Sequence, residues 1–121
     1  MRALIVDDSR FMRGYLRGML EKKGIECEEA ADGQAGLEQL HTGPAFDLAL
    51  LDWNMPTMNG LDMLKNMRAE GYGETKVLMV TTEGENNYII SALEAGADEY
   101  LMKPFDAEAL SEKLILLGLE A

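Results

Sequence analysis

The sequence predicts an α/β fold, with helices packed on both faces of a parallel five-stranded sheet. Short apolar runs of strand length recur at residues 3–6, 48–51, 77–80 and 100–102, and such runs are typical of strands buried on both faces of a parallel sheet. Segments with apolar residues at helical spacing separate the runs. This alternation of strands and helices indicates parallel strands joined by crossover helices.

The first half of the chain contains three of the expected strands. The strand at residues 3–6 leads into a helix that Ser9 can cap. The next strand is predicted at residues 25–29, where apolar and acidic residues alternate as they do in half-exposed edge strands. A short second helix follows Asp32, and the strand at residues 48–51 comes after it.

The second half repeats the pattern. Asn59 can cap a third helix, a fourth helix follows the strand at residues 77–80, and Asp106 can cap the fifth helix after the strand at residues 100–102. The apolar residues that mark these helices in chain order are Met12, Tyr15, Leu16, Met19 and Leu20, then Leu37 and Leu40, then Leu61, Leu64 and Met67, then Ile89, Ala92 and Leu93, and last Leu110, Leu114 and Leu117.

Bulk composition limits the function. The 121 residues fit one domain, residues 1–121, and the net charge of −11 argues against nucleic-acid binding, which needs clustered lysine and arginine. No apolar run approaches the length of a membrane span, and the apolar start is too short for a signal-peptide core. The single cysteine, Cys27, excludes an intramolecular disulfide and fits a reducing cytosol. We therefore expect a cytoplasmic protein with no membrane partner.

Chemically active side chains recur where the predicted strands end. Asp7 and Asp8 follow the first strand, Asp52 ends the third, Thr81 follows the fourth and Lys103 follows the fifth. In sheets of this kind the functional crevice lies at the carboxyl ends of the strands, so these side chains should converge there. A lone aspartate after a strand is more often a turn or cap residue, but the full set in order favours a functional site.

This set of side chains suits phosphoryl transfer. Clustered carboxylates repel one another, and a lysine or a bound cation relieves that repulsion. Ligands that are all oxygen favour a hard ion such as Mg²⁺. A metal and a lysine can neutralise the charge on a phosphoryl group, a hydroxyl can donate a hydrogen bond to it, and a central carboxylate can act as the nucleophile.

The chain resembles the response-regulator receiver domains of two-component systems, most of all the single-domain CheY-type chemotaxis regulators. The matching stretches cover essentially the whole chain and are residues 4–9 (LIVDDS), 52–56 (DWNMP), 80–83 (VTTE) and 100–105 (YLMKPF). The resemblance implies a flavodoxin-like three-layer (βα)5 sandwich with strand order 2-1-3-4-5. It also implies a signalling switch rather than a metabolic enzyme.

The family's roles carry over residue by residue. The resemblance implies that Asp52 accepts a phosphoryl group from a histidine kinase or phosphotransfer protein, and that Asp8, Asp52 and the backbone carbonyl of Asn54 bind Mg²⁺. Asp7 would act mainly through a metal-bound water. The remaining implied roles are hydrogen bonding of the phosphoryl group by Thr81, ion pairing by Lys103, a cis Lys103–Pro104 bond, an aromatic switch at Tyr100 coupled to Thr81, and control of dephosphorylation by Asn54, Thr82 and Glu83.

The resemblance also implies an output surface on the fourth helix, fifth strand and fifth helix. Ile89, Tyr100 and Lys113 match that surface, which binds an output protein such as a flagellar motor switch in CheY-type regulators. The start of the fourth helix, residues 85–88, lacks the lysines of the best-known relatives. A phosphatase is a further partner that the family allows.

Other functions remain open at this point. A phosphorelay shuttle would use the same site with a longer-lived phosphate. A Mg²⁺-dependent phosphohydrolase with an aspartyl nucleophile usually needs a second carboxylate close after the nucleophile, and position 54 is Asn. A flavodoxin-like cofactor binder would need a phosphate-binding glycine loop after the first strand, where Asp7 and Asp8 stand instead.

Overall fold

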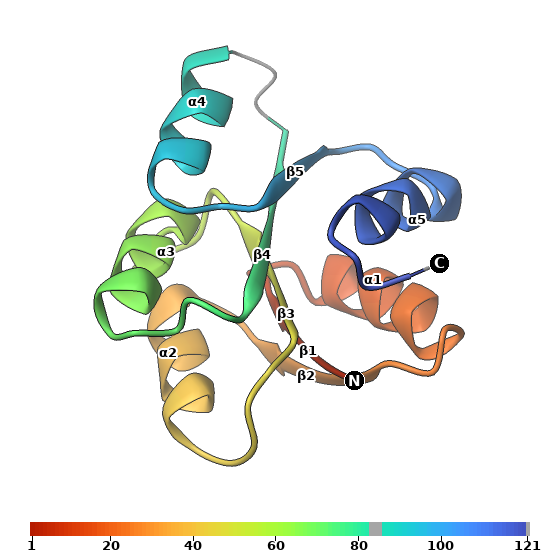
Figure 1. Cartoon of the computed structure of the whole chain (residues 1–121), viewed down its shortest axis with the longest axis horizontal. Coiled ribbons are helices and arrows are strands. Elements are labelled where there is room, and N and C mark those ends of the chain that lie inside the picture. Colours follow the sequence, from red (N-terminus) through yellow and green to blue (C-terminus); the bar gives the residue numbers. More distant parts are fainter. Residues whose placement is uncertain (83–85, 121) are drawn as a thin grey trace.

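The computed structural model describes residues 1–82 and 86–120, and the side chains of Asn86 and Asn87 are not described. Strands and helices alternate along the chain (Figure 1). Their bounds are β1 Arg2–Val6, α1 Arg10–Glu21, β2 Glu26–Ala30, α2 Gly33–His41, β3 Leu48–Asp52, α3 Gly60–Ala69, β4 Lys76–Thr81, α4 Asn86–Glu94, β5 Glu99–Met102 and α5 Ala107–Leu116.

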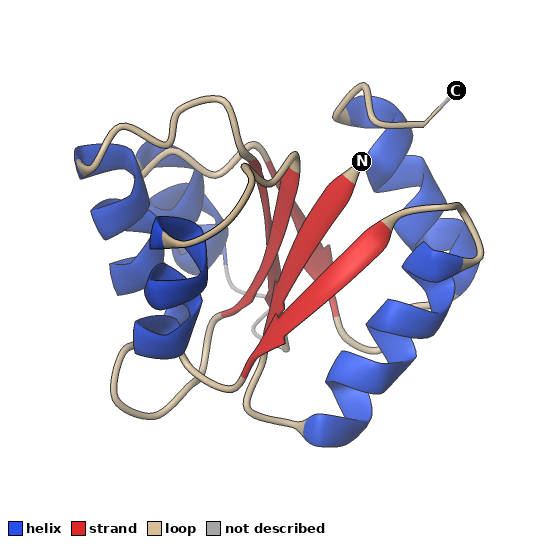
Figure 2. Ribbon diagram, turned by 90° about the horizontal axis from the view of Figure 1, so that it is seen from below, coloured by secondary structure: helices blue, strands red, loops and turns tan. Residues whose placement is uncertain are grey.

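The strands form one parallel sheet in the order β2-β1-β3-β4-β5. Helices α1 and α5 cover one face of the sheet, and α2, α3 and α4 cover the other (Figures 1 and 2). The predicted fold class and strand order are therefore confirmed. The strand order reverses between β1 and β3, the switch point at which open α/β sheets form their functional crevices.

The core consists of two apolar layers because the inner strands are buried on both faces. Every residue of β3 is buried, and consecutive strand residues point to opposite layers. In contrast, β2 lies at the sheet edge and alternates exposed and buried residues, as its sequence predicts. Burial on this scale fixes the strand register, so the residues at the strand ends have defined neighbours.

Side-chain caps set the starts of four helices that follow the carboxyl ends of the strands, α1, α2, α3 and α5. Ser9, Asp32, Asn59 and Asp106 each accept a hydrogen bond from a backbone N–H in the first turn of the next helix. The caps at Ser9, Asn59 and Asp106 were predicted from the sequence, and the structure adds the cap at Asp32. They hold the loops between strand ends and helices, which carry the candidate functional residues.

Candidate phosphoryl-transfer site

Strand register brings the candidate site together. Val6 of β1 pairs with Leu51 of β3, so the next residues along the two strands, Asp7 and Asp52, lie side by side. On the side of β3 opposite to β1, Thr81 of β4 pairs with Met102 of β5, and Lys103 follows Met102 directly. Asp52 and Thr81 belong to the strands themselves and are their last residues.

The side chains of Asp7, Asp52 and Lys103 are in direct contact. The Lys103 Nζ lies 3.1 Å from Asp7 Oδ2 and 3.4 Å from Asp52 Oδ1. These groups are largely withdrawn from water, with side-chain exposures of 16% for Lys103, 2% for Asp7 and 8% for Asp52. Coulomb attraction is stronger in such surroundings than at an exposed surface, so the lysine is a fixed part of the site.

Asp8 completes an acidic cluster, defined here as Asp7, Asp8 and Asp52. One carboxylate oxygen from each residue lies within 4.8 Å of the others. Asp7 and Asp52 are buried, whereas Asp8 is exposed. The cluster is therefore shielded from solvent at Asp7 and Asp52 and open to solvent at Asp8. Three oxygen donors so close together suit a hard divalent cation that keeps some of its waters.

The environment of Asp52 raises its pKa from 3.8 to about 6. Burial is the largest cause, because it penalises the charged carboxylate, and repulsion from Asp7 adds to it. The ammonium of Lys103 acts in the opposite direction and lowers the pKa of Asp52. The two carboxylates, through hydrogen bonds and charge, raise the pKa of Lys103 above 10.5 despite its burial. The lysine is thus protonated at neutral pH.

Asp7 and Asp8 differ from Asp52 in their surroundings. Both carboxylate oxygens of Asp7 accept hydrogen bonds, Oδ1 from the backbone N–H of Ser9 at 2.8 Å and Oδ2 from Lys103. Asp8 points to solvent. Asp52 therefore combines burial, a raised pKa and a central position between the other two carboxylates and the lysine.

Residues around the acidic cluster occupy the strand-end loops. Thr81 is 3% exposed, and its carbonyl accepts a hydrogen bond from the Lys103 N–H at 2.8 Å. Asn54 and Thr82 are exposed in the loops after β3 and β4. Glu83 lies outside the described residues. The Lys103–Pro104 peptide bond is cis, as the resemblance implies.

The predicted output residues lie on β5 and its flanking helices. The Lys113 Nζ of α5 lies 4.3 Å from the centre of the Tyr100 ring, and it donates to Glu99 Oε1 at 3.0 Å. Tyr100 is therefore held in contact with α5 by a cation–π interaction. Ile89 is half-buried on α4, which flanks β5 on the other side (Figure 1).

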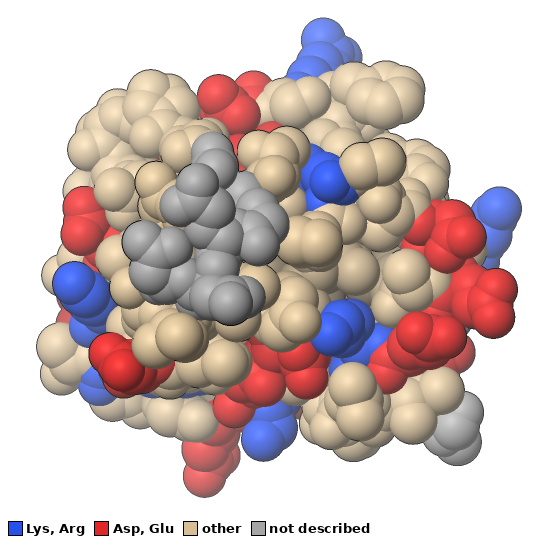
Figure 3. Space-filling model, turned by 90° about the horizontal axis from the view of Figure 1, so that it is seen from above, with Lys and Arg blue, Asp and Glu red and all other residues tan. Residues whose placement is uncertain are grey.

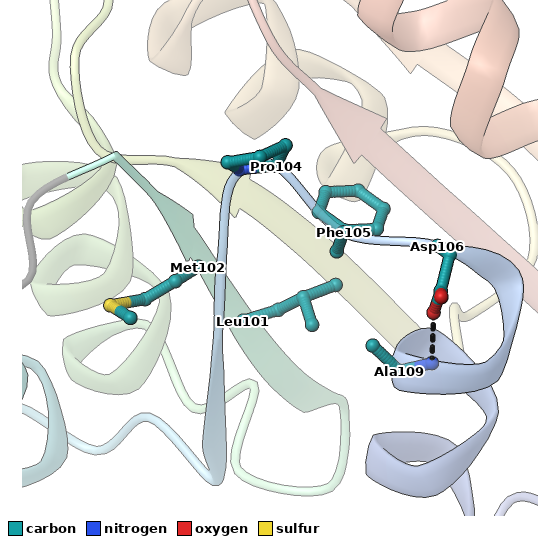
Figure 4. A pocket seen from close by; sticks show the side chains of 6 residues that line it. All are labelled: Leu101, Met102, Pro104, Phe105, Asp106 and Ala109. Atoms are coloured by element: carbon teal, nitrogen blue, oxygen red, sulfur yellow. Dashed lines mark hydrogen bonds between the residues drawn. The ribbon is translucent and has the colours of Figure 1, made fainter.

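A shallow hollow of about 410 Å³ opens beside the lysine loop. Figure 4 shows its lining, which is formed by Leu101, Met102, Pro104, Phe105, Asp106 and Ala109. The lining is mainly apolar, and the Asp106 carboxylate is engaged in capping α5 through the Ala109 N–H at 2.9 Å. This hollow offers a surface for apolar contact and no chemistry of its own.

The molecular surface carries the acidic balance of the sequence. On the side shown in Figure 3, acidic side chains form clusters, and basic side chains are scattered between them. Within the described part of the chain, no helix is both long enough and apolar enough to cross a membrane.

Sequence reasoning overlooked one residue at the edge of the site. The Arg13 Nη1 donates to the backbone carbonyl of Asp7 at 2.7 Å. Arg13 stands with Arg10 and Arg17 on the predicted first helix, and charged residues on such a helix more often form a solvated face. Its position one turn into the helix that follows Asp7 is the signal that could have identified it, because such a side chain can reach back to the strand end.

The chain matches proteins of one family along nearly its whole length. A family model of the response regulator receiver domain matches residues 3–115. Chemotaxis protein CheY1 of Helicobacter pylori (strain J99) is 41% identical over 121 residues, which cover 98% of this chain and 98% of that protein. Chemotaxis protein CheY-3 of Vibrio cholerae is 45% identical over 116 residues, covering 94% of this chain and 88% of that protein.

Solved structures agree with these matches. Vibrio cholerae chemotaxis protein CheY4 superposes with a TM-score of 0.89 at 34% identity, covering 96% of this chain and 97% of that chain. A chain of the CheX–CheY–BeF3–Mg²⁺ complex of Borrelia burgdorferi superposes with a TM-score of 0.92 at 26% identity, covering 99% of this chain and 90% of that chain. With its strand order, its acidic cluster and these relatives in agreement, the chain belongs to the response regulator receiver family.

Proposed function

We propose that this protein is a phosphorylation-dependent signalling switch in which Asp52 accepts a phosphoryl group from a histidine kinase or phosphotransfer protein. The observation that carries the proposal is the contrast between the two buried carboxylates. Both oxygens of Asp7 are held by hydrogen bonds, whereas Asp52 has a pKa of about 6. Asp52 is thus largely ionised at neutral pH, yet it is more basic than an ordinary aspartate and so a better nucleophile.

In the proposed reaction, a carboxylate oxygen of Asp52 attacks the donor phosphorus in line with the leaving group. A new O–P bond forms while the P–N bond to the donor imidazole breaks, and the imidazole nitrogen takes up a proton from solvent. Lys103, which already contacts Asp52, stabilises the charge on the phosphoryl oxygens. Thr81, at the end of β4, supplies a hydroxyl for the phosphoryl group.

We infer that the acidic cluster takes Mg²⁺ as its cofactor. The donor set is all oxygen, and its oxygens lie within 4.8 Å of one another. Asp8, Asp52 and the Asn54 carbonyl would hold the ion, with Asp7 acting through a water. When bound, Mg²⁺ supplies positive charge that offsets the carboxylates and the phosphoryl oxygens. The Borrelia burgdorferi CheX–CheY complex, which contains Mg²⁺, supports this choice.

The output that we propose is a change on the surface formed by α4, β5 and α5. Thr81 and Tyr100 lie on adjacent strands, so a movement of Thr81 toward the phosphoryl group would free space into which Tyr100 can turn. That turn would break the contact between Tyr100 and Lys113. Ile89 lies on the same surface. The relatives named as chemotaxis proteins favour a chemotaxis target, with a flagellar motor protein as one candidate and a phosphatase such as CheX as a regulator.

Labelling with acetyl phosphate tests the acceptor. Wild-type protein incubated with acetyl phosphate and Mg²⁺ should gain one phosphoryl group by intact mass, and Asp52→Asn should gain none. Asp62→Asn, which removes an exposed carboxylate from α3, serves as the control and should label like wild type. Undiminished labelling of Asp52→Asn would refute the assignment.

A further inference from the structure

We propose that Arg13 is a positioning residue for the acidic cluster, an inference that rests on the proposed function of that cluster. Arg13 lies on α1 and its side chain is 16% exposed. Its Nη1 donates to the Asp7 carbonyl at 2.7 Å, while its Nε donates to Glu29 Oε1 of β2 at 3.1 Å. One guanidinium thus joins the end of β1 to the neighbouring strand.

The bond from Arg13 completes the fixation of Asp7. The Asp7 N–H donates to the Ala30 carbonyl at 3.1 Å, and its carboxylate accepts from the Ser9 N–H and from Lys103. The carbonyl oxygen is the remaining polar atom of Asp7, and Arg13 supplies its hydrogen bond. Since a charged donor makes a stronger hydrogen bond than a neutral one, this contact restrains the end of β1 effectively.

The restraint passes directly to Asp8. The Asp7 carbonyl belongs to the planar peptide unit that joins Asp7 to Asp8. A hydrogen bond that fixes this oxygen therefore also fixes the orientation of the Asp8 N–H and the direction in which the Asp8 chain continues. Asp8 is exposed and would otherwise be the least restrained member of the acidic cluster.

A second arginine on α1, Arg17, binds the same Glu29 carboxylate as Arg13. The Arg17 Nη1 donates to Glu29 Oε2 at 2.6 Å, and its Nη2 donates to the Cys27 carbonyl. Glu29 therefore accepts from both arginines, one helical turn apart. Arg13 and Arg17 have the same charge, helix and carboxylate partner, and each also bonds one backbone carbonyl. Arg17 also lies 3.8 Å from Glu21 of the same helix. Arg13 holds the Asp7 carbonyl and Arg17 does not, so Arg17 provides a control matched in charge, helix and carboxylate partner.

Mg²⁺ titration of matched variants tests the inference, with the fluorescence of Trp53 or calorimetry as the readout. Loss of residues that orient metal ligands commonly weakens metal binding on the order of tenfold or more, and we expect about tenfold weaker binding for Arg13→Met. Arg17→Met removes an equal charge without touching Asp7, so its affinity should stay within about twofold of wild type. Arg13→Lys, which keeps the charge and one donor, should recover part of the loss.

A metal-free measurement separates this inference from the proposed function. In EDTA, hydrogen exchange of the Ser9 amide, which bonds the Asp7 carboxylate, should be faster in Arg13→Met and unchanged in Arg17→Met. If Arg13→Met does not fold, Arg13→Gln is judged on the same two measurements. Equal effects of the two arginine changes, or none from Arg13, would overturn the inference. Failure of the wild type to bind Mg²⁺ would instead overturn the proposed function.

Discussion

In the folded protein Asp52 keeps its proton up to a higher pH than an ordinary aspartate does, so the free energy of unfolding depends on pH. The pKa of Asp52 is 3.8 in an unstructured chain and about 6 in the folded protein. Between these pH values the folded state holds a proton that the unfolded state has lost. Stability therefore falls as the pH rises from about 4 to about 6, and the penalty is fully present above pH 6.

Asp52→Asn should therefore stabilise the metal-free protein at neutral pH. The difference between 3.8 and about 6 limits the gain in unfolding free energy to about 3 kcal/mol, because each tenfold change in a proton equilibrium corresponds to about 1.4 kcal/mol. Urea unfolding in EDTA should show this gain at pH 7.5 and lose most of it at pH 4. Glu38→Gln, at an exposed position on α2, should change stability by less than about 0.5 kcal/mol. A destabilised Asp52→Asn at pH 7.5 would contradict the assignment of the raised pKa.

Among individual residues, the members of the acidic cluster could be predicted from the sequence because each stands at the end of an apolar run. Asp7, Asp52 and Lys103 could be placed together from strand order alone. Arg13 was not predicted there, because an arginine on an amphipathic helix usually faces solvent. Its position one turn after Asp7 shows that it can reach the strand end, and the packing angle of α1 on the sheet decides that it does. The contact between Tyr100 and Lys113 depends in the same way on how α5 lies over β5.

At the scale of elements, the strands were predicted well but their ends were not. Arg2, Lys76 and Glu99 begin β1, β4 and β5, although each is polar and falls outside the apolar run. Strand pairing uses backbone groups, so a polar residue can join the ladder while its side chain reaches solvent. An apolar run therefore marks the buried part of a strand rather than its full length.

Helix α4 departs most from its apolar pattern. Ala92 is 2% exposed, but Leu93 and Ile90 are 44% and 51% exposed. The helical spacing of Ile89, Ala92 and Leu93 predicted a helix there, but it did not predict that Ala92 is the only buried residue within the described range 88–94. A helix whose described side chains are mostly exposed is weakly held, which suits the change that we propose for the surface formed by α4, β5 and α5.

A single arginine, Arg68, connects the end of α3 to two loops, the one between α3 and β4 and the one between α4 and β5. Arg68 donates to the carbonyls of Tyr72, Thr75 and Gly96 and pairs with the Asp98 carboxylate at 3.0 Å. We expect Arg68→Met to lower the unfolding free energy by about 3 kcal/mol, because it leaves several partly buried acceptors without a donor. Chemical denaturation measures this loss.

The control for Arg68 is Lys65→Met, which removes an exposed positive charge from the same helix. Its effect should be smaller than about 0.5 kcal/mol, since surface substitutions away from such networks are nearly neutral. Equal destabilisation by the two changes would mean that the lost charge, and not the hydrogen-bond network, is responsible.

For the whole molecule, the residue pattern predicted a parallel α/β sheet, whereas the strand order came from the family resemblance. Alternating strands and helices are compatible with several orders, because the pattern does not say on which side of β1 each new strand is added. The order determines which loops meet. With β1 between β2 and β3, the loop after β1 lies beside β3, and Asp7 meets Asp52.

The lifetime of the phosphorylated state distinguishes a chemotaxis switch from a phosphorelay shuttle. An aspartyl phosphate is hydrolysed when water attacks in line with the bond to the carboxylate, so residues beside that path set the rate. Asn54 and Thr82 are exposed next to the site, and Asn54 can hold a water rather than exclude it. We therefore predict that the phosphate is lost within seconds to a few minutes in Mg²⁺ buffer after the donor is removed.

Substitution at position 54 tests the cause of this lifetime. Asn54→Arg places a larger, basic side chain beside the path of the attacking water and should lengthen the lifetime several-fold, because water is then positioned less often for attack. Thr42→Arg adds the same side chain at an exposed position after α2, at the opposite end of the sheet, and should leave the lifetime unchanged. Decay of intact mass in both variants measures the effect. A wild-type phosphate that survives for hours would favour the shuttle, and equal lifetimes in the two variants would show that Asn54 does not control access of water to Asp52.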